Sequence, residues 1–243
     1  EISINNSQQT SDGFLKLFIM AATYNEVKEG NLEEDVVTPY IERMMEADSN
    51  EATNELILLI GNQDTTRGLE IINEYIDQNG YSYTNIGSSF NLENETYSGD
   101  ESNYTSVRGV TGLLQAIYNK TCVNRDYSKK MLEMINMNQT FKELIPSTIE
   151  DGTVYNKQEE LSNTLADSAI IEIGRVKYIV AIKGIDLTNK DEAREVIKSI
   201  SSMIYQYYNS KRAIQTNDND KIDTVMDGNR VCYWVPDQSA YVS

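Results

Sequence analysis

The chain has 243 residues, of which 40% are hydrophobic, and this is enough for one large globular domain or two small ones. Its formal net charge of -17 makes nucleic acid an unfavourable partner, and no run of about 18 apolar residues predicts a membrane span. Histidine is absent, which excludes Ser-His-Asp and Cys-His catalysis and argues against a transition-metal site. We predict no metal and no cofactor.

Most of the N-terminal two thirds of the chain has the spacing of helices. Residues 14–27 are apolar on most faces, as expected of a helix buried at the centre of a domain. The polar stretch 81–103 lacks this periodicity and is predicted to be a long loop. Further helices are predicted at residues 40–47, 51–60, 65–79, 106–119 and 126–136.

Beyond Pro146 the pattern changes to short strands. Strands are predicted at 153–156, 168–173 and 176–182, the last two joined by a tight hairpin, and a long amphipathic helix at 190–208. Strands at both ends and helices between them predict an α+β fold with an inserted helical half. We predict a single domain over 1–243, whose helical half is about 14–145 and whose sheet half is about 1–12 plus 150–243.

Four stretches stand out when they are read in order. Thr-Ser-Asp-Gly-Phe-Leu-Lys at 10–16 opens the central helix, Asp-Ser-Asn stands at 48–50, a helical pair follows over 103–132, and Lys-Gln-Glu stands at 157–159. In these stretches the chain resembles the class A β-lactamases and penicillin-binding serine acyl-transferases, whose motifs are Ser-x-x-Lys, Ser-Asp-Asn and Lys-Thr-Gly. The resemblance covers most of residues 1–209. It implies a β-lactamase/transpeptidase-like fold, an antiparallel sheet flanked by helices with an inserted helical subdomain.

The first motif lacks the family's nucleophile. In that family a serine hydroxyl attacks a carbonyl, and a lysine one helical turn later acts on its proton. Lys16 matches the lysine, but three residues before it stands Gly13, which has no side chain. Ser11 is the nearest hydroxyl, yet it lies five residues before Lys16 and outside the predicted helix.

The second motif is altered as well. Asp48 stands where the family has a serine, Ser49 replaces the aspartate, and only Asn50 matches. We expect the extra carboxylate of Asp48 to form an ion pair with Lys16 rather than to relay protons.

The third motif keeps only its first residue. Lys157 matches, whereas Gln158 and Glu159 replace Thr and Gly. A glutamate here is expected to add bulk and to repel a substrate carboxylate. Counting back from Asn103 points to Glu95 as the candidate for the glutamate that activates the deacylating water, and a solvated acidic loop is the alternative interpretation.

The two cysteines, Cys122 and Cys232, fit no metal-ligand spacing, so they form either a disulfide or two buried thiols. Members of the family usually have two strands before the central helix, but only residues 2–5 are available here. We therefore predict that 231–235 joins the main sheet or covers its edge, pinned through Cys232 to Cys122.

These features favour a catalytically silent β-lactamase-like domain of a bacterial surface or secreted protein, used as a binding or adhesion module. The resemblance implies an extracellular or cell-wall location, where a protein, a peptidoglycan-like component or a host ligand would be the partner. Lys16 and Lys157 are candidates for a positive floor under an anionic ligand, with structural pairing as the alternative. The alternative function is an active serine-type β-lactamase or carboxypeptidase-like hydrolase with a non-standard nucleophile. A third is a purely structural module of a larger surface protein.

Overall fold

A computed structural model describes residues 6–81, 83–92, 100–137, 141–216, 224–227, 230–235 and 240–242, together with 2 and 4, with side chains through Ser210. The elements in chain order are β1 (Gln9–Thr10), α1 (Leu15–Lys28), α2 (Glu34–Glu46), α3 (Asn50–Ile60), α4 (Thr65–Gln78), β2 (Asn85–Ile86), β3 (Asn103–Thr105), α5 (Val107–Tyr118), α6 (Arg125–Met137), η1 (Pro146–Thr148), β4 (Thr153–Glu160), β5 (Leu165–Ile173), β6 (Val176–Gly184), α7 (Lys190–Thr216), β7 (Thr224–Asp227), β8 (Arg230–Val235) and β9 (Ala240–Val242).

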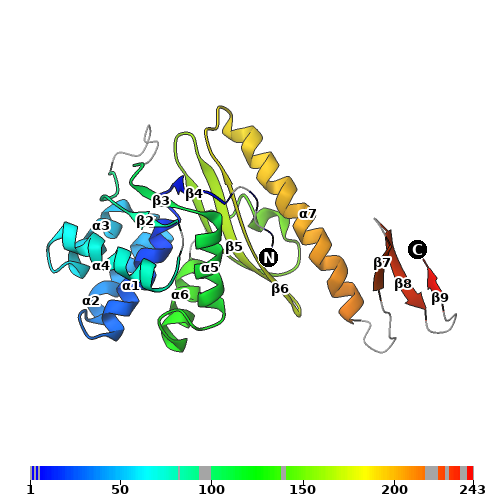
Figure 1. Cartoon of the computed structure of the whole chain (residues 1–243), viewed down its shortest axis with the longest axis horizontal. Coiled ribbons are helices and arrows are strands. Elements are labelled where there is room, and N and C mark those ends of the chain that lie inside the picture. Colours follow the sequence, from blue (N-terminus) through cyan, green and yellow to red (C-terminus); the bar gives the residue numbers. More distant parts are fainter. Residues whose placement is uncertain are drawn as a thin grey trace.

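Helix α1 is the centre of the helical half, as its apolar composition predicted. All residues from Leu15 to Tyr24 are buried, because helices α2 to α6 pack around it (Figure 1). A helix that is apolar all round has no solvent-facing stripe and is stable only inside such a shell. The start of α1 is therefore held in the interior of the protein.

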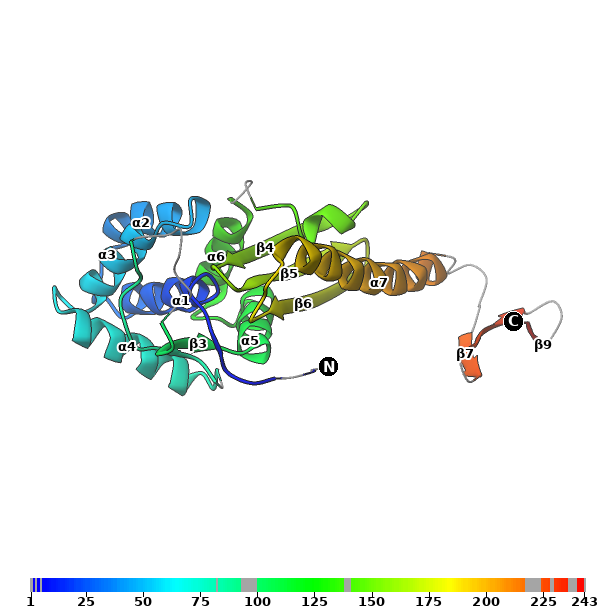
Figure 2. The ribbon, with the colours of Figure 1, turned by 90° about the horizontal axis from the view of Figure 1, so that it is seen from above.

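The main sheet is antiparallel, with the strand order β4-β5-β6. Its β5–β6 hairpin turns at Gly174, whose φ of +59° suits glycine, and this confirms the predicted hairpin. Helices α5 and α6 lie on one face of the sheet and α7 on the other (Figure 2). Strand β4 is longer than predicted and runs through Glu160, so that residues 157–159 lie within a paired strand rather than after it.

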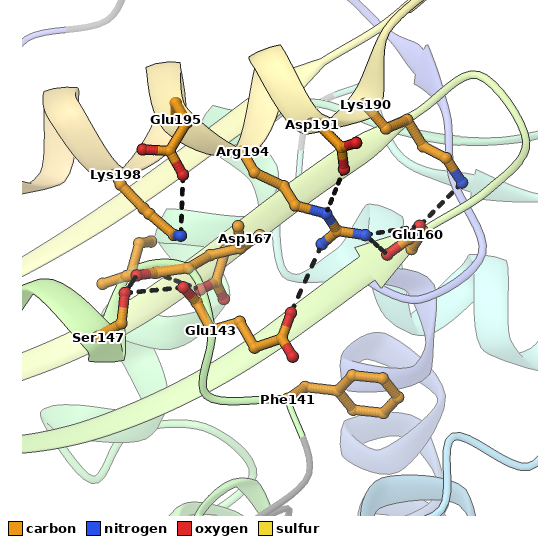
Figure 3. Close-up of polar contacts among 12 residues, drawn as sticks. Phe141, Glu143, Ser147, Glu160, Asp167, Lys190, Asp191, Arg194, Glu195 and Lys198 are labelled. Carbon is orange, nitrogen blue, oxygen red and sulfur yellow. Dashed lines mark hydrogen bonds and ion pairs between the residues drawn. The ribbon is translucent and has the colours of Figure 1, made fainter.

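The N-terminal part of α7 is fastened to the end of β4 by charged side chains. Arg194 makes two hydrogen bonds to the carboxylate of Glu160, at 2.9 and 2.7 Å, and Lys190 adds a third at 2.8 Å (Figure 3). Glu143 lies 3.8 Å from Arg194. This face of α7 is thus committed to the sheet and to the segment before η1.

Two helices are longer than the sequence predicted. Helix α2 begins at Glu34, ahead of the predicted start at residue 40, and it includes Pro39, although proline lacks the amide proton that a helix interior uses. Helix α7 continues eight residues past the predicted end at Tyr208, to Thr216. Although α7 spans 27 residues, no helix among the described residues is long and apolar enough to cross a membrane.

The prediction for residues 231–235 is wrong. These residues lie in β8, which pairs with β7 and β9 in a separate three-stranded sheet beyond the C-terminal end of α7 (Figure 1). Helix α7 leads the chain away from the edge of the main sheet before β8 begins. The division into one domain with two halves stays a prediction.

Candidate functional site

The start of α1 lies directly against strand β4. A Cβ atom added to Gly13 would lie 2.9 Å from the Cβ of Glu159 and 3.1 Å from the backbone oxygen of Gln158. Carbon atoms in contact normally lie about 3.5–4.0 Å apart. The family motif has a serine at this position, but the structure has no room for a serine side chain here unless β4 moves.

The Glu159 carboxylate points inward and binds the N-terminus of α1. Its Oε2 accepts hydrogen bonds from the Ser11 hydroxyl at 2.5 Å, from the backbone N–H of Asp12 at 3.2 Å and from that of Phe14 at 3.1 Å. Its Oε1 accepts a 2.7 Å bond from the Lys183 ammonium, and the side chains of both residues are almost fully buried. The first N–H groups of a helix have no partner within the helix and favour an anion, which Glu159 supplies.

These contacts also decide the protonation state of Glu159. Burial by itself raises the pKa of a carboxyl group, but the charge of Lys183 and the hydrogen bonds from Lys183, Ser11 and Phe14 outweigh it. The pKa of Glu159 is therefore lowered below its usual range, and the group is an anion at neutral pH. The sequence analysis expected this carboxylate to repel a substrate carboxylate, whereas in the structure it is buried and is bound by Lys183 and by the start of α1.

Asp48 joins the two lysines of the site. Its Oδ1 accepts hydrogen bonds from Lys16 at 2.9 Å and from Lys157 at 2.7 Å, and its backbone oxygen accepts a second bond from Lys16 at 2.5 Å. The predicted Lys16–Asp48 ion pair is therefore present. Both lysine side chains are 1% exposed, whereas that of Asp48 is 32% exposed, so solvent reaches this triad only at Asp48.

The triad shifts the pKa of two of its members. Burial lowers the pKa of Lys16, and Asp48 only partly offsets this effect. Burial raises the pKa of Asp48, but Lys157 and Lys16 outweigh it, so the net shift is downward. Both lysines are thus paired with Asp48, as the structural alternative predicted, while their role under an anionic ligand stays a prediction.

Two of the remaining predicted residues, Ser49 and Asn50, make hydrogen bonds that hold the backbone, whereas the side-chain oxygen of the buried Gln158 has no hydrogen-bond partner among the described residues. Ser49 caps α3 by accepting a 3.1 Å hydrogen bond from the N–H of Ala52, and Asn50 donates a 2.6 Å bond to the backbone oxygen of Asn91. The side chain of Gln158 is buried. Glu95 lies outside the described residues.

Phe90 lies over the ammonium group of Lys16, and the sequence interpretation missed it. Asn54 holds the backbone of Phe90 through two hydrogen bonds of 2.8 Å, and the ring centroid lies 6.0 Å from the Lys16 ammonium. Its side chain is 2% exposed. Two surface hollows, about 350 Å³ beside α7 and about 420 Å³ beside α4, lie elsewhere, and neither is lined by Gly13, Lys16 or Phe90.

A second buried carboxylate, Asp12, was also missed. Neither of its oxygen atoms has a hydrogen-bond partner among the described residues, and its residue is 4% exposed. Burial and the neighbouring charge of Glu159 raise the pKa of Asp12 to about 6. Asp12 thus changes its charge close to neutral pH.

Of the two alternatives for Cys122, a disulfide or a buried thiol, the structure has the thiol. Cys122 is a buried free thiol, 3.5 Å from the hydroxyl oxygen of Tyr75 and 3.9 Å from the sulfur of Met131. Burial raises its pKa, which makes it a poor nucleophile. The side chain of Cys232 lies outside the described part of the chain.

Comparison with known proteins identifies a family that the chain matches in sequence and in fold. A model of the β-lactamase enzyme family matches residues 37–208. The chain is similar to the chromosome-encoded β-lactamase of Vibrio parahaemolyticus, with a TM-score of 0.72, 17% identity and coverage of 83% of this chain and 86% of that one. It is also similar to a β-lactamase from Sphaerobacter thermophilus DSM 20745, with a TM-score of 0.71, 16% identity and coverage of 83% and 84%.

A third similar structure is PBP-A, with a TM-score of 0.68, 19% identity and coverage of 82% of this chain and 80% of that one. No curated protein sequence matches the chain. At these identities the structural likeness concerns the fold, and it confirms the predicted α+β, β-lactamase-like class.

Proposed function

The chain belongs to the β-lactamase enzyme family, and we propose that it is a catalytically silent member used as a binding or adhesion module. The observation that carries the proposal is the contact between Gly13 and Glu159. The nucleophile position lacks a side chain, and the space that one would need is filled by strand β4. A serine acyl-enzyme requires both the hydroxyl and access to it.

The altered residues also bind one another rather than leave an open site. Glu159 is bound by Lys183 and by the start of α1, and Asp48 is bound by Lys16 and Lys157. A buried ion is stable only when its charge and hydrogen bonds are satisfied. These pairs join α1, the start of α3 and the sheet, so in this proposal the former catalytic positions hold the two halves of the fold together.

The alternative function is a hydrolase with a different nucleophile. Ser11 is the candidate with an observation in its favour, because its hydroxyl donates a 2.5 Å hydrogen bond to Glu159, as a nucleophile does to a general base. However, Ser11 is fully buried, and its proton is committed to a carboxylate that Lys183 and α1 also hold. A substrate carbonyl has no route to that oxygen atom.

Incubation with a fluorescent penicillin, followed by intact-mass measurement, tests the catalytic part of the proposal. We expect no covalent adduct on the wild-type chain, while PBP-A, one variant of which forms an acyl-enzyme complex with penicillin G, serves as the positive control. An adduct on the wild-type chain would contradict the proposal. Loss of that adduct in Ser11→Ala would then identify Ser11 as the nucleophile.

We also propose an extracellular or cell-wall location in a bacterium, supported by the family to which the chain belongs. A peptidoglycan-like component, a protein or a host ligand remains the proposed class of partner. Co-sedimentation with purified peptidoglycan tests the first of these, with heat-unfolded chain as the control. If the chain stays in the supernatant, the cell-wall component is excluded, and a protein or a host ligand is left. Protease treatment of intact cells tests the location, because a chain protected until lysis would contradict it.

A further inference from the structure

A surface hollow of about 350 Å³ lies where helix α7 packs against η1. Ser199 and Ser202 line it from α7. Ser147 lines it from η1, and Glu150 lines it from the segment after η1. All seven lining residues are polar or charged, and none of them belongs to the site around Gly13. The volume is at the lower end of the range of about 300–1,000 Å³ for small-molecule sites, so the hollow has room for a small ligand.

The two walls of the hollow are fixed to each other. The hydroxyl oxygen atoms of Thr148 on η1 and Ser201 on α7 lie 2.7 Å apart, and Ser201 is only 2% exposed. Arg194 also fastens α7 to Glu160 of β4, through hydrogen bonds of 2.9 and 2.7 Å (Figure 3). A preformed site loses less binding free energy to the ordering of its own residues than a flexible one does. The hollow is therefore shaped before a ligand arrives.

Several polar groups in the hollow have hydrogen-bonding capacity that the protein does not use. Among the described residues, no hydrogen bond involves the side chain of Glu150 or of Ser199. The hydroxyl oxygen of Ser202 accepts one bond of 3.5 Å from within α7, which leaves its proton free. The Ser147 hydroxyl donates a 2.7 Å bond to the backbone oxygen of Leu144, which leaves its lone pairs free. The hollow thus offers a ligand both donors and acceptors.

The charges around the hollow nearly cancel. Lys198 and Glu195 on α7 form a 3.0 Å ion pair (Figure 3). Within the described part of the chain, this leaves Glu150 as the one charge in the lining that has no partner. A lone carboxylate disfavours a simple anion, and it is too few ligands for a metal ion such as Ca²⁺, which takes several oxygen atoms. The remaining groups fit a ligand rich in hydroxyl groups, because a hydroxyl both donates and accepts hydrogen bonds.

We propose that this hollow binds a saccharide, with the Glu150 carboxylate accepting hydrogen bonds from sugar hydroxyls and with Ser199 and Ser202 exchanging hydrogen bonds with them. The proposal rests on the binding function proposed above, and it names the place of that binding and the class of ligand. The second hollow, of about 420 Å³, is a poorer candidate. Three carboxylates of α4 line it, and no basic side chain among the described residues offsets them there.

Saturation-transfer-difference NMR on the full chain tests the proposal, because it detects weak ligands in rapid exchange. One probe is the N-acetylglucosamine and N-acetylmuramic acid disaccharide of peptidoglycan, and the other is a neutral galactose and N-acetylglucosamine disaccharide of the kind found on host glycans. We expect binding with a Kd of about 0.1–10 mM, since a shallow hollow covers only part of its ligand. The probe that binds more tightly identifies the source of the saccharide.

Removing the unused groups should weaken that binding. The double variant Glu150→Ala with Ser199→Ala loses an acceptor and a hydroxyl, and we expect its Kd to rise about tenfold. Both residues are exposed, so the fold should be unaffected, and an unchanged Tm checks this. Thr66→Ala with Glu74→Ala is the matched control, because these residues are exposed on α4 and line the second hollow. We expect the control to bind like the wild type.

The absence of binding by both probes at about 20 mM overturns the proposal, and so does an equal loss of binding in the control variant. Two results separate its failure from that of the proposed function. If the wild type and the Glu150 and Ser199 double variant bind the same probe equally, the hollow is not the site, while the binding function stands. A penicillin adduct on the wild-type chain would contradict the proposed function without changing the NMR result.

Discussion

Replacing Gly13 with serine separates two explanations for the proposed lack of catalytic activity. One is the missing hydroxyl group, and the other is a site that is closed to substrate. The new Cβ would lie 2.9 Å from the Cβ of Glu159 and 3.1 Å from its Cα, closer than carbon atoms normally pack. Both atoms belong to a strand paired with β5, so the strand has to shift by about half an ångström or more.

The shift of the strand lowers the stability of the fold, and the replacement of glycine offsets a small part of that loss. Overpacking of a buried site costs about 1–3 kcal/mol. Serine also restricts the unfolded chain more than glycine does, and this stabilises the folded state by roughly 0.5 kcal/mol. Gly13→Ser is therefore expected to destabilise the fold by about 0.5–2.5 kcal/mol, and at about 2–4 °C per kcal/mol the Tm falls by about 1–10 °C.

Thermal unfolding followed by circular dichroism measures this change, and the penicillin assay is run on the same sample. Gly112→Ser is the matched control, because a Cβ at Gly112, in helix α5, meets nothing within 4 Å. We expect that control to leave the Tm unchanged or to raise it slightly, since serine favours a helix more than glycine does. A Gly13→Ser variant that keeps the wild-type Tm and is acylated by penicillin would refute the closed site.

Three further predictions concern the buried charges and the thiol. Asp48→Asn leaves Lys16 and Lys157 without their shared counter-charge and should lower the free energy of unfolding by about 3 kcal/mol in urea titrations; an unchanged urea midpoint would contradict the triad. Because burial and Glu159 raise the pKa of Asp12 to about 6, its protonated form stabilises the fold below pH 3.8, and this is lost as the pH rises through 6. Asp12→Asn should therefore match the wild type near pH 4 and exceed it by up to about 3 kcal/mol above pH 6, and equal stabilities at pH 8 would count against the assignment. Finally, denatured chain that has never been reduced should alkylate at Cys122, seen by intact mass; labelling only after reduction would show a disulfide that the structure lacks.

Local sequence patterns were sufficient to predict those features of the fold that depend on residues close together along the chain. The apolar run over 17–22 could be stable only as a buried central helix, and the turn at Gly174 required a left-handed backbone. The Lys16–Asp48 ion pair was also predictable, because the family pattern places both residues at one site. Helix ends were less predictable, as Pro39 within α2 shows, since packing against other helices offsets a missing hydrogen bond.

The sequence by itself determined that the nucleophile position is a glycine and that all three motifs are altered. It could not determine whether the altered site is open or closed. That depends on Glu159, which lies 148 residues from the Ser11 hydroxyl that it binds, and on Phe90, which lies far from Lys16 along the chain. Only the folded chain decides which way Glu159 points, because a buried carboxylate turns toward the cations and N–H groups that stabilise it, and Lys183 and the start of α1 meet it only once β4 has paired within the sheet.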